Sequence, residues 1–157
     1  MRRRLAFLVV PALAVGCVES PGIPTVPEQI LSLQVTASAA SFPRGSSVTV
    51  TVTLTNTLEE LIRLTFPTSC QALLFVRTTT GQVVAPPDGR YDCASVPTQI
   101  SLPAGEATTF SFVWSGESQF GPPGSGVQLP PGDYFVSAEL NADGYVGFAF
   151  PVKVVLN

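Results

Sequence analysis

The residue types that perform acid–base and nucleophilic catalysis are scarce in this chain. Histidine is absent from all 157 residues. Ser-His-Asp and Cys-His catalytic arrangements and histidine-ligated zinc are therefore excluded, because each needs an imidazole as base or ligand. The remaining residues place no base beside a nucleophile. We expect a protein that is not an enzyme and that uses no cofactor.

Acidic residues in loops and turns are the remaining candidates for metal chemistry. Asp88 and Asp92 share a loop with Arg90, whereas Asp133 and Asp143 lie at turns. A calcium site needs several oxygen ligands that converge on one point. Aspartate is also common in turns for its own sake, because its side chain hydrogen-bonds nearby backbone groups. The turn role is the better explanation, and we expect no bound metal.

Three cysteines carry the covalent chemistry of the sequence. Cys17 ends an apolar N-terminal run, whereas Cys70 and Cys93 flank an apolar segment and the loop after it. An exported protein meets an oxidising compartment, so we expect a disulfide between Cys70 and Cys93. A redox-active pair would need Cys-x-x-Cys spacing and an activating base, and the sequence has neither.

The N-terminus has the order of an export signal. Residues 1–4 form a positive region, and residues 5–15 are almost uninterruptedly apolar. This run is shorter than the roughly 20 residues of a membrane span and is typical of a secretory signal peptide. Leu13-Ala14-Val15-Gly16-Cys17 resembles the lipobox of bacterial lipoproteins, in which lipid is attached to the cysteine and the signal is cut before it. Ala14 replaces the usual leucine, and the alternative is ordinary cleavage that leaves Cys17 as a free thiol.

These features divide the sequence into three parts. We expect a signal peptide at residues 1–16, a lipid-anchored proline-rich tether at residues 17–29 and one domain at residues 30–157. The prolines of the tether recur every third residue, as in polyproline II, although an unstructured linker would serve equally well. Without the signal peptide the protein keeps five basic and eleven acidic residues, a net charge of −6. A negative net charge does not favour binding of nucleic acid. The expected location is the cell envelope.

Alternation of apolar and polar residues with a period of two predicts that the domain is made of β-strands. The clearest case is residues 48–55, where Val or Leu alternates with Thr, as in a strand with one buried and one wet face. Residues 72–76 are apolar on both faces, which is typical of a central strand. The alternation at residues 148–156 places Phe148 and Phe150 on the same face as Val154. Further alternating segments are residues 31–36, 62–66, 110–114 and 134–140.

Turn signals at residues 80–82 and 141–144 separate these strands. Seven to eight short strands at this spacing predict an all-β fold, an immunoglobulin-like antiparallel β-sandwich. Trp114 is expected in its core. Tyr134 stands where a tyrosine corner would place it, with its hydroxyl returning to upstream backbone.

Two long loops, residues 85–99 and 116–129, are candidate binding elements, because long loops inside compact domains are uncommon and often functional. Exposed aromatic side chains are typical anchors of protein interfaces. The alternative is that the aromatic residues fold back onto the sandwich, since such residues are often buried. Four residues of these loops are the candidate contacts with a partner: Tyr91, Asp92, Glu117 and Phe120.

A series of short motifs runs through the domain. In sequence order they are Phe42-Pro43-Arg44-Gly45, Asn56-Thr57, Leu64-Thr65-Phe66-Pro67, Thr80-Gly81-Gln82, Leu102-Pro103-Ala104-Gly105-Glu106, Phe112-Val113-Trp114 and Pro131-Gly132-Asp133-Tyr134. This order resembles the intracellular proteinase inhibitor (BsuPI) family over roughly residues 31–140. The resemblance implies an immunoglobulin-like sandwich that acts on a protease. It carries over no inhibitory residue, and it requires neither export nor a Cys70–Cys93 pair.

Together these features predict a lipid-anchored, non-enzymatic protein-binding module of the bacterial cell envelope that modulates or inhibits a protease. Its expected partners are the membrane, through lipid on Cys17, and a protein, which the resemblance suggests is a protease. The alternative is an architectural or assembly accessory domain without inhibitory activity.

Overall fold

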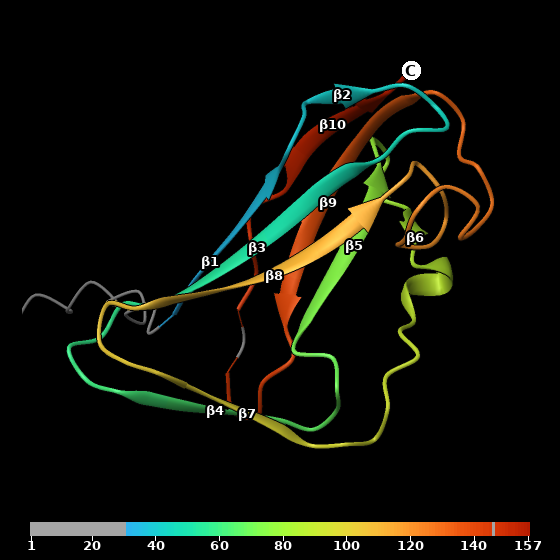
Figure 1. Ribbon diagram of the computed structural model, residues 1–157. Coiled ribbons are helices and arrows are strands. Elements are labelled where there is room, and N and C mark those ends of the chain that lie inside the picture. Colours follow the sequence, from blue (N-terminus) through green and yellow to red (C-terminus); the bar gives the residue numbers. More distant parts are fainter. Residues whose placement is uncertain (1–30, 146) are drawn as a thin grey trace, which may run out of the picture.

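The computed structural model describes residues 31–145 and 147–157, and within them the protein forms ten strands and one short 3₁₀ turn (Figure 1). The predicted signal peptide, the tether and Cys17 lie outside the described residues. The elements are β1 (Leu31–Ala37), β2 (Ser41–Phe42), β3 (Val48–Asn56), β4 (Ile62–Phe66), β5 (Ala72–Thr78), β6 (Val83–Ala85), η1 (Pro87–Gly89), β7 (Thr98–Leu102), β8 (Ala107–Trp114), β9 (Gly132–Leu140) and β10 (Val152–Leu156).

The strands form two facing sheets and a separate pair. One sheet has the order β1-β3-β8, the other has the order β2-β10-β9-β5-β6, and β4 pairs with β7. Every pairing is antiparallel except that of β10 with β2. The predicted all-β sandwich is confirmed. The structure has more strands than the predicted seven to eight. β2 and β6 are too short to leave an alternation pattern, and β7 was not among the alternating segments because only Ile100 and Leu102 carry its pattern.

The core lies between the two sheets. On β3 the valines and Leu54 point inward and are essentially inaccessible to solvent, whereas the threonines between them lie on the other face. On β9 the side chains from Tyr134 to Leu140 alternate in the same way, with every second residue buried. This is the arrangement that period-two patterning produces when each sheet has one face against the other.

Trp114 fills one end of this core and has no exposed surface. The rings of Phe42 and Tyr134 pack edge-on against it, with centroid distances of 5.5 and 5.6 Å. Its indole N–H is satisfied, because Nε1 donates to the carbonyl oxygen of Glu117 at 2.9 Å. The Tyr134 hydroxyl donates to the carbonyl of Pro130 at 2.7 Å, so the predicted tyrosine corner and the buried tryptophan are both confirmed.

The β4–β7 pair crosses below the two sheets (Figure 1) and contributes Ile62, Leu64 and Phe66 to the same core. Asn56, at the end of β3, ties this pair to the sandwich. Its fully buried side-chain amide donates to the carbonyls of Glu60 at 2.7 Å and of Leu102 and Pro103 at 3.0 Å each. Its Oδ1 accepts the N–H of Leu58 at 3.0 Å. One side chain thus supplies hydrogen-bond partners to backbone groups just before β4 and at the end of β7.

The expected disulfide is present. Cys70 and Cys93 are bonded, with their Cα atoms 5.6 Å apart, and they join the turn before β5 to the loop before β7. The side chain of Asn141 donates to the carbonyl of Cys70 at 2.9 Å. In the chain-entropy model, closing a loop of this length stabilises the fold by about 3 kcal/mol.

The C-terminal strand is shorter than the sequence pattern predicts. Residues 148–150 lie outside β10, and Phe148 and Phe150 are exposed, whereas Ala149 between them is buried. The prediction that both phenylalanines share the core face of Val154 is wrong. Pro151 lacks an N–H and cannot continue a ladder, so the backbone enters β10 only at Val152 and the inward face changes register across the proline.

The buried amide of Asn56 leads to a stability prediction. Replacing Asn56 with Ala leaves buried carbonyls without a donor, and each such group costs about 1–3 kcal/mol. We expect N56A to lower the free energy of unfolding by about 3 kcal/mol, measured by urea denaturation. Thr53→Ala, on the wet face of the same strand, is the control and should change it by less than about 0.5 kcal/mol. Equal stability of N56A and wild type would show that the amide does not hold the β4–β7 pair.

Candidate functional site

The first long loop folds back onto the sandwich through Tyr91. The Tyr91 hydroxyl accepts the N–H of Leu74 at 2.7 Å and donates to the carbonyl of the same residue. Since β6 pairs with β5 only at Val76 and Arg77, the tyrosine takes the hydrogen-bonding position that a longer β6 would occupy. Burial raises the pKa of Tyr91 far above its usual value. The hydroxyl therefore stays protonated and serves as a structural cap of the β5 edge.

The second long loop meets the first at Phe120. Its ring stacks on Tyr91 with a centroid distance of 6.4 Å and packs edge-on against Phe112 of β8 at 6.1 Å. Phe120 also forms a β-bridge with Trp114. The two loops thus connect the β8 edge of one sheet to the β5 edge of the other. Tyr91 and Phe120 are half-buried in contacts within the domain, as the alternative interpretation expects.

Glu117 organises the second loop from within. Its side chain is only 5% exposed, and its carboxylate oxygens accept the N–H groups of Gly124 and Gly126 at 2.7 Å each. These hydrogen bonds lower the pKa of the Glu117 carboxyl below its usual value. Of the four candidate contact residues, Asp92 alone is exposed. Binding of a partner by these loops stays a prediction, with Asp92 and the exposed loop tip as its available contacts.

The described residues offer no assembled metal centre. In residues 31–145 and 147–157, no three Cys, Asp or Glu side chains lie where they could hold one ion. The same part of the protein has no helix with the length and apolar character needed to cross a membrane.

A pocket lies on the outer face of the five-stranded sheet. Its volume is about 400 Å³, and it is lined mainly by β5, β9 and the segment before β10. Phe135 and Phe148 provide apolar wall, whereas Arg77, Ser137 and Glu139 provide polar groups. Mixed apolar and polar lining with a few directed polar groups is typical of binding sites.

Phe148 lines this pocket, Phe150 lies between the lining residues Ala149 and Pro151, and the two phenylalanines are 66% and 93% exposed. The segment that carries them is fixed to β9, because Ala149 donates its N–H to the carbonyl of Ala138 at 2.9 Å and Phe148 forms a bridge with Glu139. The two rings therefore project from a held backbone. We call Arg77, Phe135, Phe148 and Phe150 the phenylalanine surface.

Arg77 is the cationic member of the phenylalanine surface. Its guanidinium lies 5.7 Å from the centroid of the Phe75 ring, and Nη1 donates to the carbonyl of Gly81 at 3.4 Å. Within the described residues, Lys153 and Asp133 form a salt bridge, and no carboxylate is paired with Arg77. Sequence reasoning missed this surface because it assigned both phenylalanines to the core; Pro151 was the available signal.

A match to a protein-family model identifies the family of the domain. Residues 35–145, more than two thirds of the sequence, match the model of the intracellular proteinase inhibitor (BsuPI) family. The chain belongs to the BsuPI family. This finding confirms the resemblance seen in the order of motifs. No curated protein matches the sequence.

The protein is similar to several solved structures at low sequence identity. The CARDB domain of the PF1109 protein from Pyrococcus furiosus is 13% identical, with a TM-score of 0.50 over 81% of this protein and 87% of that one. The C-terminal domain of wzt is 12% identical, with a TM-score of 0.49 over 83% and 75%. A β-glucosidase from Erythrobacter marinus is 15% identical, with a TM-score of 0.47 over 81% of this protein but only 15% of the enzyme.

The charge on Glu117 leads to a pH prediction. A carboxyl whose pKa is lowered in the folded state stabilises the fold above its unfolded pKa of about 4.3, and this contribution is lost as the pH falls through the folded pKa. We expect E117Q to melt below wild type at pH 7, and the difference to shrink below about pH 4. Thermal denaturation from pH 7 to pH 3 measures this, with exposed Glu59→Gln as the control. A difference that does not depend on pH would contradict the role of the charge.

Proposed function

We propose that this BsuPI-family domain is a non-enzymatic protein-binding module that a lipid on Cys17 holds at the bacterial cell envelope, and that it modulates or inhibits a protease. The family assignment supports the inhibitory role. The disulfide between Cys70 and Cys93 suits an oxidising compartment such as the one an exported protein enters.

The observation that carries the proposal is the exposure of Phe148 and Phe150 beside a pocket. Large apolar side chains held in solvent beside a concave surface are typical of protein interaction sites. Burying the side chain of one phenylalanine contributes about 1.5–3 kcal/mol. Because the backbone that carries both rings is already fixed to β9, binding orders few additional residues.

The chemistry of the phenylalanine surface describes the partner. Apolar walls from Phe135 and Phe148 fit an apolar side chain, and Arg77, which no carboxylate pairs within the described residues, fits an acidic group beside it. Guanidinium groups bind carboxylates through paired hydrogen bonds. The partner surface we propose is an apolar residue next to Asp, Glu or a C-terminal carboxylate.

Removal of the two rings tests this proposal. We expect Phe148→Ser/Phe150→Ser to keep the melting temperature of wild type, because both side chains are exposed. Inhibition constants against a panel of purified serine proteases should show at least one protease that wild type inhibits, and the double variant should weaken that inhibition by about 30-fold or more, as loss of roughly 2 kcal/mol of burial requires. Leu61→Ser, which alters another exposed apolar residue (51%) outside the phenylalanine surface and outside both long loops, should inhibit like wild type.

Two outcomes would contradict the proposal. If the double variant inhibits as well as wild type, recognition lies elsewhere, with the loop around Asp92 as the next candidate. If wild type inhibits no protease of the panel and captures only a structural complex from solubilised envelope, the architectural role replaces the inhibitory one.

Lipid attachment is tested separately at Cys17. One acyl group binds a membrane only marginally, so stable anchoring takes two or more. We expect Cys17→Ala to leave the domain folded and to release it from the membrane fraction, as measured by fractionation and immunoblotting. Ser20→Ala, a substitution in the predicted tether, should remain in the membrane fraction. Retention of C17A in the membrane together with normal cleavage of the precursor would rule out the anchor.

A further inference from the structure

Strand β8 has one edge that lacks a strand partner along most of its length. In the order β1-β3-β8 it is the last strand, and all of it pairs with β3 on one side. On the other side only its C-terminal end is covered, where the N–H of Gly121 donates to the carbonyl of Val113 at 2.8 Å. Within the described residues, no backbone group bonds this side of residues 107–112.

The direction of the Val113 carbonyl identifies the groups that this edge offers. In an antiparallel sheet, residues two apart direct their N–H and C=O groups to the same side. Since the Val113 carbonyl points away from β3, the N–H and C=O groups of Ser111 and Thr109 do so as well. Their side chains lie on the outer face of the sheet. The edge therefore presents an alternating row of hydrogen-bond donors and acceptors.

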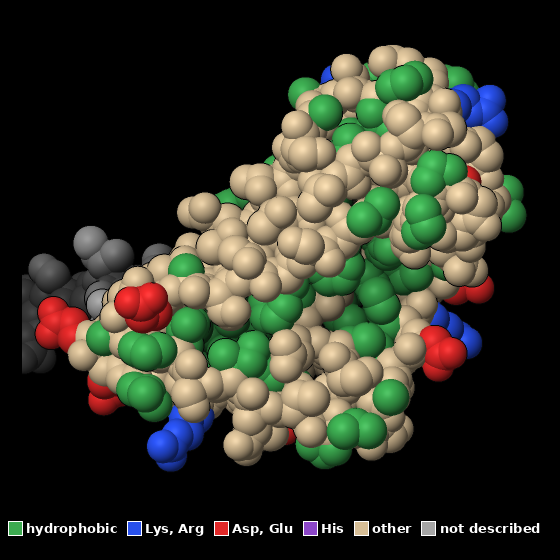
Figure 2. Space-filling view, viewed as in Figure 1, with side chains coloured by type: hydrophobic (Ala, Val, Ile, Leu, Met, Phe, Trp, Pro, Cys, Tyr) green, Lys and Arg blue, Asp and Glu red, His purple; other side chains and the backbone are tan. Residues whose placement is uncertain are grey.

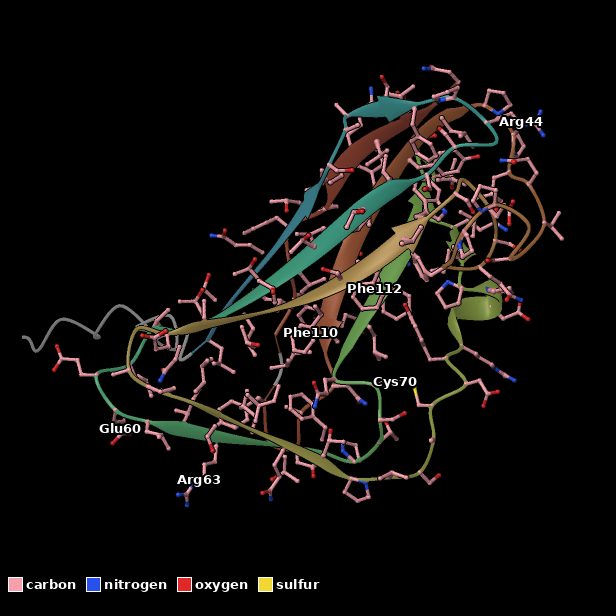
Figure 3. The ribbon with its side chains drawn as sticks, viewed as in Figure 1. Arg44, Glu60, Arg63, Cys70, Phe110 and Phe112 are labelled. Carbon is pink, nitrogen blue, oxygen red and sulfur yellow. A yellow bond between two sulfur atoms is a disulfide. The ribbon has the colours of Figure 1, made fainter. Side chains whose placement is uncertain are left out.

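An apolar hollow lies beside this row. Phe110 and Phe112 point from β8 toward β4 and β7 (Figure 3), and both are only partly buried, whereas Trp114 on the same face is completely buried. Figure 2 shows apolar side chains at the floor of a hollow between β8 and the β4–β7 pair. Across the hollow, β7 pairs with β4 alone among the described strands.

Neither strand that borders the hollow is protected against pairing. Natural edge strands usually carry charged side chains or proline, which oppose the addition of another strand. Thr98–Leu102 and Ala107–Trp114 contain no charged residue and no proline. An edge left in this state is suited to strand addition, in which main-chain hydrogen bonds hold an extended peptide and alternate side chains enter a pocket.

We propose that the free edge of β8 binds an extended, uncharged segment of a partner protein as an additional strand. Alternate apolar side chains of that segment fill the hollow beside Phe110 and Phe112, and its backbone pairs with Thr109 and Ser111. The occupant is a single extended segment rather than a second copy of the domain, because β7 lies across the hollow and the contact between the two long loops closes one end. This site is separate from the phenylalanine surface and does not depend on the proposed function.

The protein itself shows which kind of sequence pairs with β8. On its other side β8 pairs with Val48–Asn56, in which apolar residues alternate with threonine. A synthetic peptide of that sequence, with flanking lysines for solubility and a fluorophore, is therefore the probe. Fluorescence polarisation with the purified full-length protein should show saturable binding. Phe148→Ser/Phe150→Ser should bind the probe like wild type, which separates this site from the phenylalanine surface.

A proline substitution tests the edge itself. Thr109→Pro removes an N–H that points away from β3, so the ladder between β3 and β8 keeps its hydrogen bonds while the edge loses a donor. We expect T109P to weaken binding of the probe by about tenfold or more, the effect of losing a hydrogen bond worth roughly 1.4 kcal/mol, with a small change in melting temperature. Thr109→Ala keeps the N–H and should bind like wild type. If T109P does not fold, Ser111→Pro makes the same test one hydrogen-bonding position along.

Amide hydrogen exchange tests the proposal without any substitution. The amides of Thr109 and Ser111 should exchange rapidly in the free full-length protein and become protected when the probe is added. The proposal is overturned if the probe does not bind, or if T109P binds it as tightly as T109A. It is equally overturned if both amides are already protected in the free protein. Exchange measured after deletion of residues 18–29 would then show whether the tether covers the edge, and exchange measured after dilution would show whether a second copy does.

Discussion

Burial of the Asn56 side chain is the interaction on which the shape of this domain depends. A neutral amide can be removed from water at modest cost when all of its hydrogen-bonding groups are satisfied, whereas a buried charge would need a counter-ion. Here the amide binds the carbonyl of Glu60, just before β4, and the carbonyls of Leu102 and Pro103, where β7 ends. The pair is thereby held below the two sheets as a third element. The hollow beside β8 exists because the pair is tied at this end and does not hydrogen-bond to β8.

The two sides of the sandwich are closed to different extents. At the β5 edge, the hydroxyl of Tyr91 stands in for a strand, and its ring stacks on Phe120 to reach the other sheet. The same contact covers the end of β8 near Trp114 but leaves the beginning of that strand without a partner. The stacked rings join the two loops at this end of the sandwich, and the rest of the β8 edge has no strand partner among the described residues.

The composition of the surface determines how this protein can recognise others. Only 12% of the residues are charged, and the faces of β3 and β8 that point to solvent carry mostly threonine and serine. The features suited to recognition in the described residues include exposed rings, arginine cations such as that of Arg77, and unpaired backbone edges. Both surfaces singled out above, the phenylalanine surface and the β8 edge, are of these kinds.

The sequence by itself determined the elements whose physics is local. Alternation at residues 48–55 defined β3 because side chains of a strand alternate between faces. Trp114 and Tyr134 followed from the fold class, and the Cys70–Cys93 pair followed from the expectation that the protein is exported. The absence of histidine and the succession of motifs likewise needed only the sequence. The roles of Tyr91, Glu117 and Phe120 were decided by tertiary structure, since their hydrogen-bond and ring partners are distant in the sequence or belong to a folded loop. The exposure of Phe148 and Phe150 was decided there too. Their alternation with Val152 and Val154 looks continuous in the sequence, apart from Pro151. The burial of Ala149 and its hydrogen bond to Ala138 show that Pro151 separates two registers.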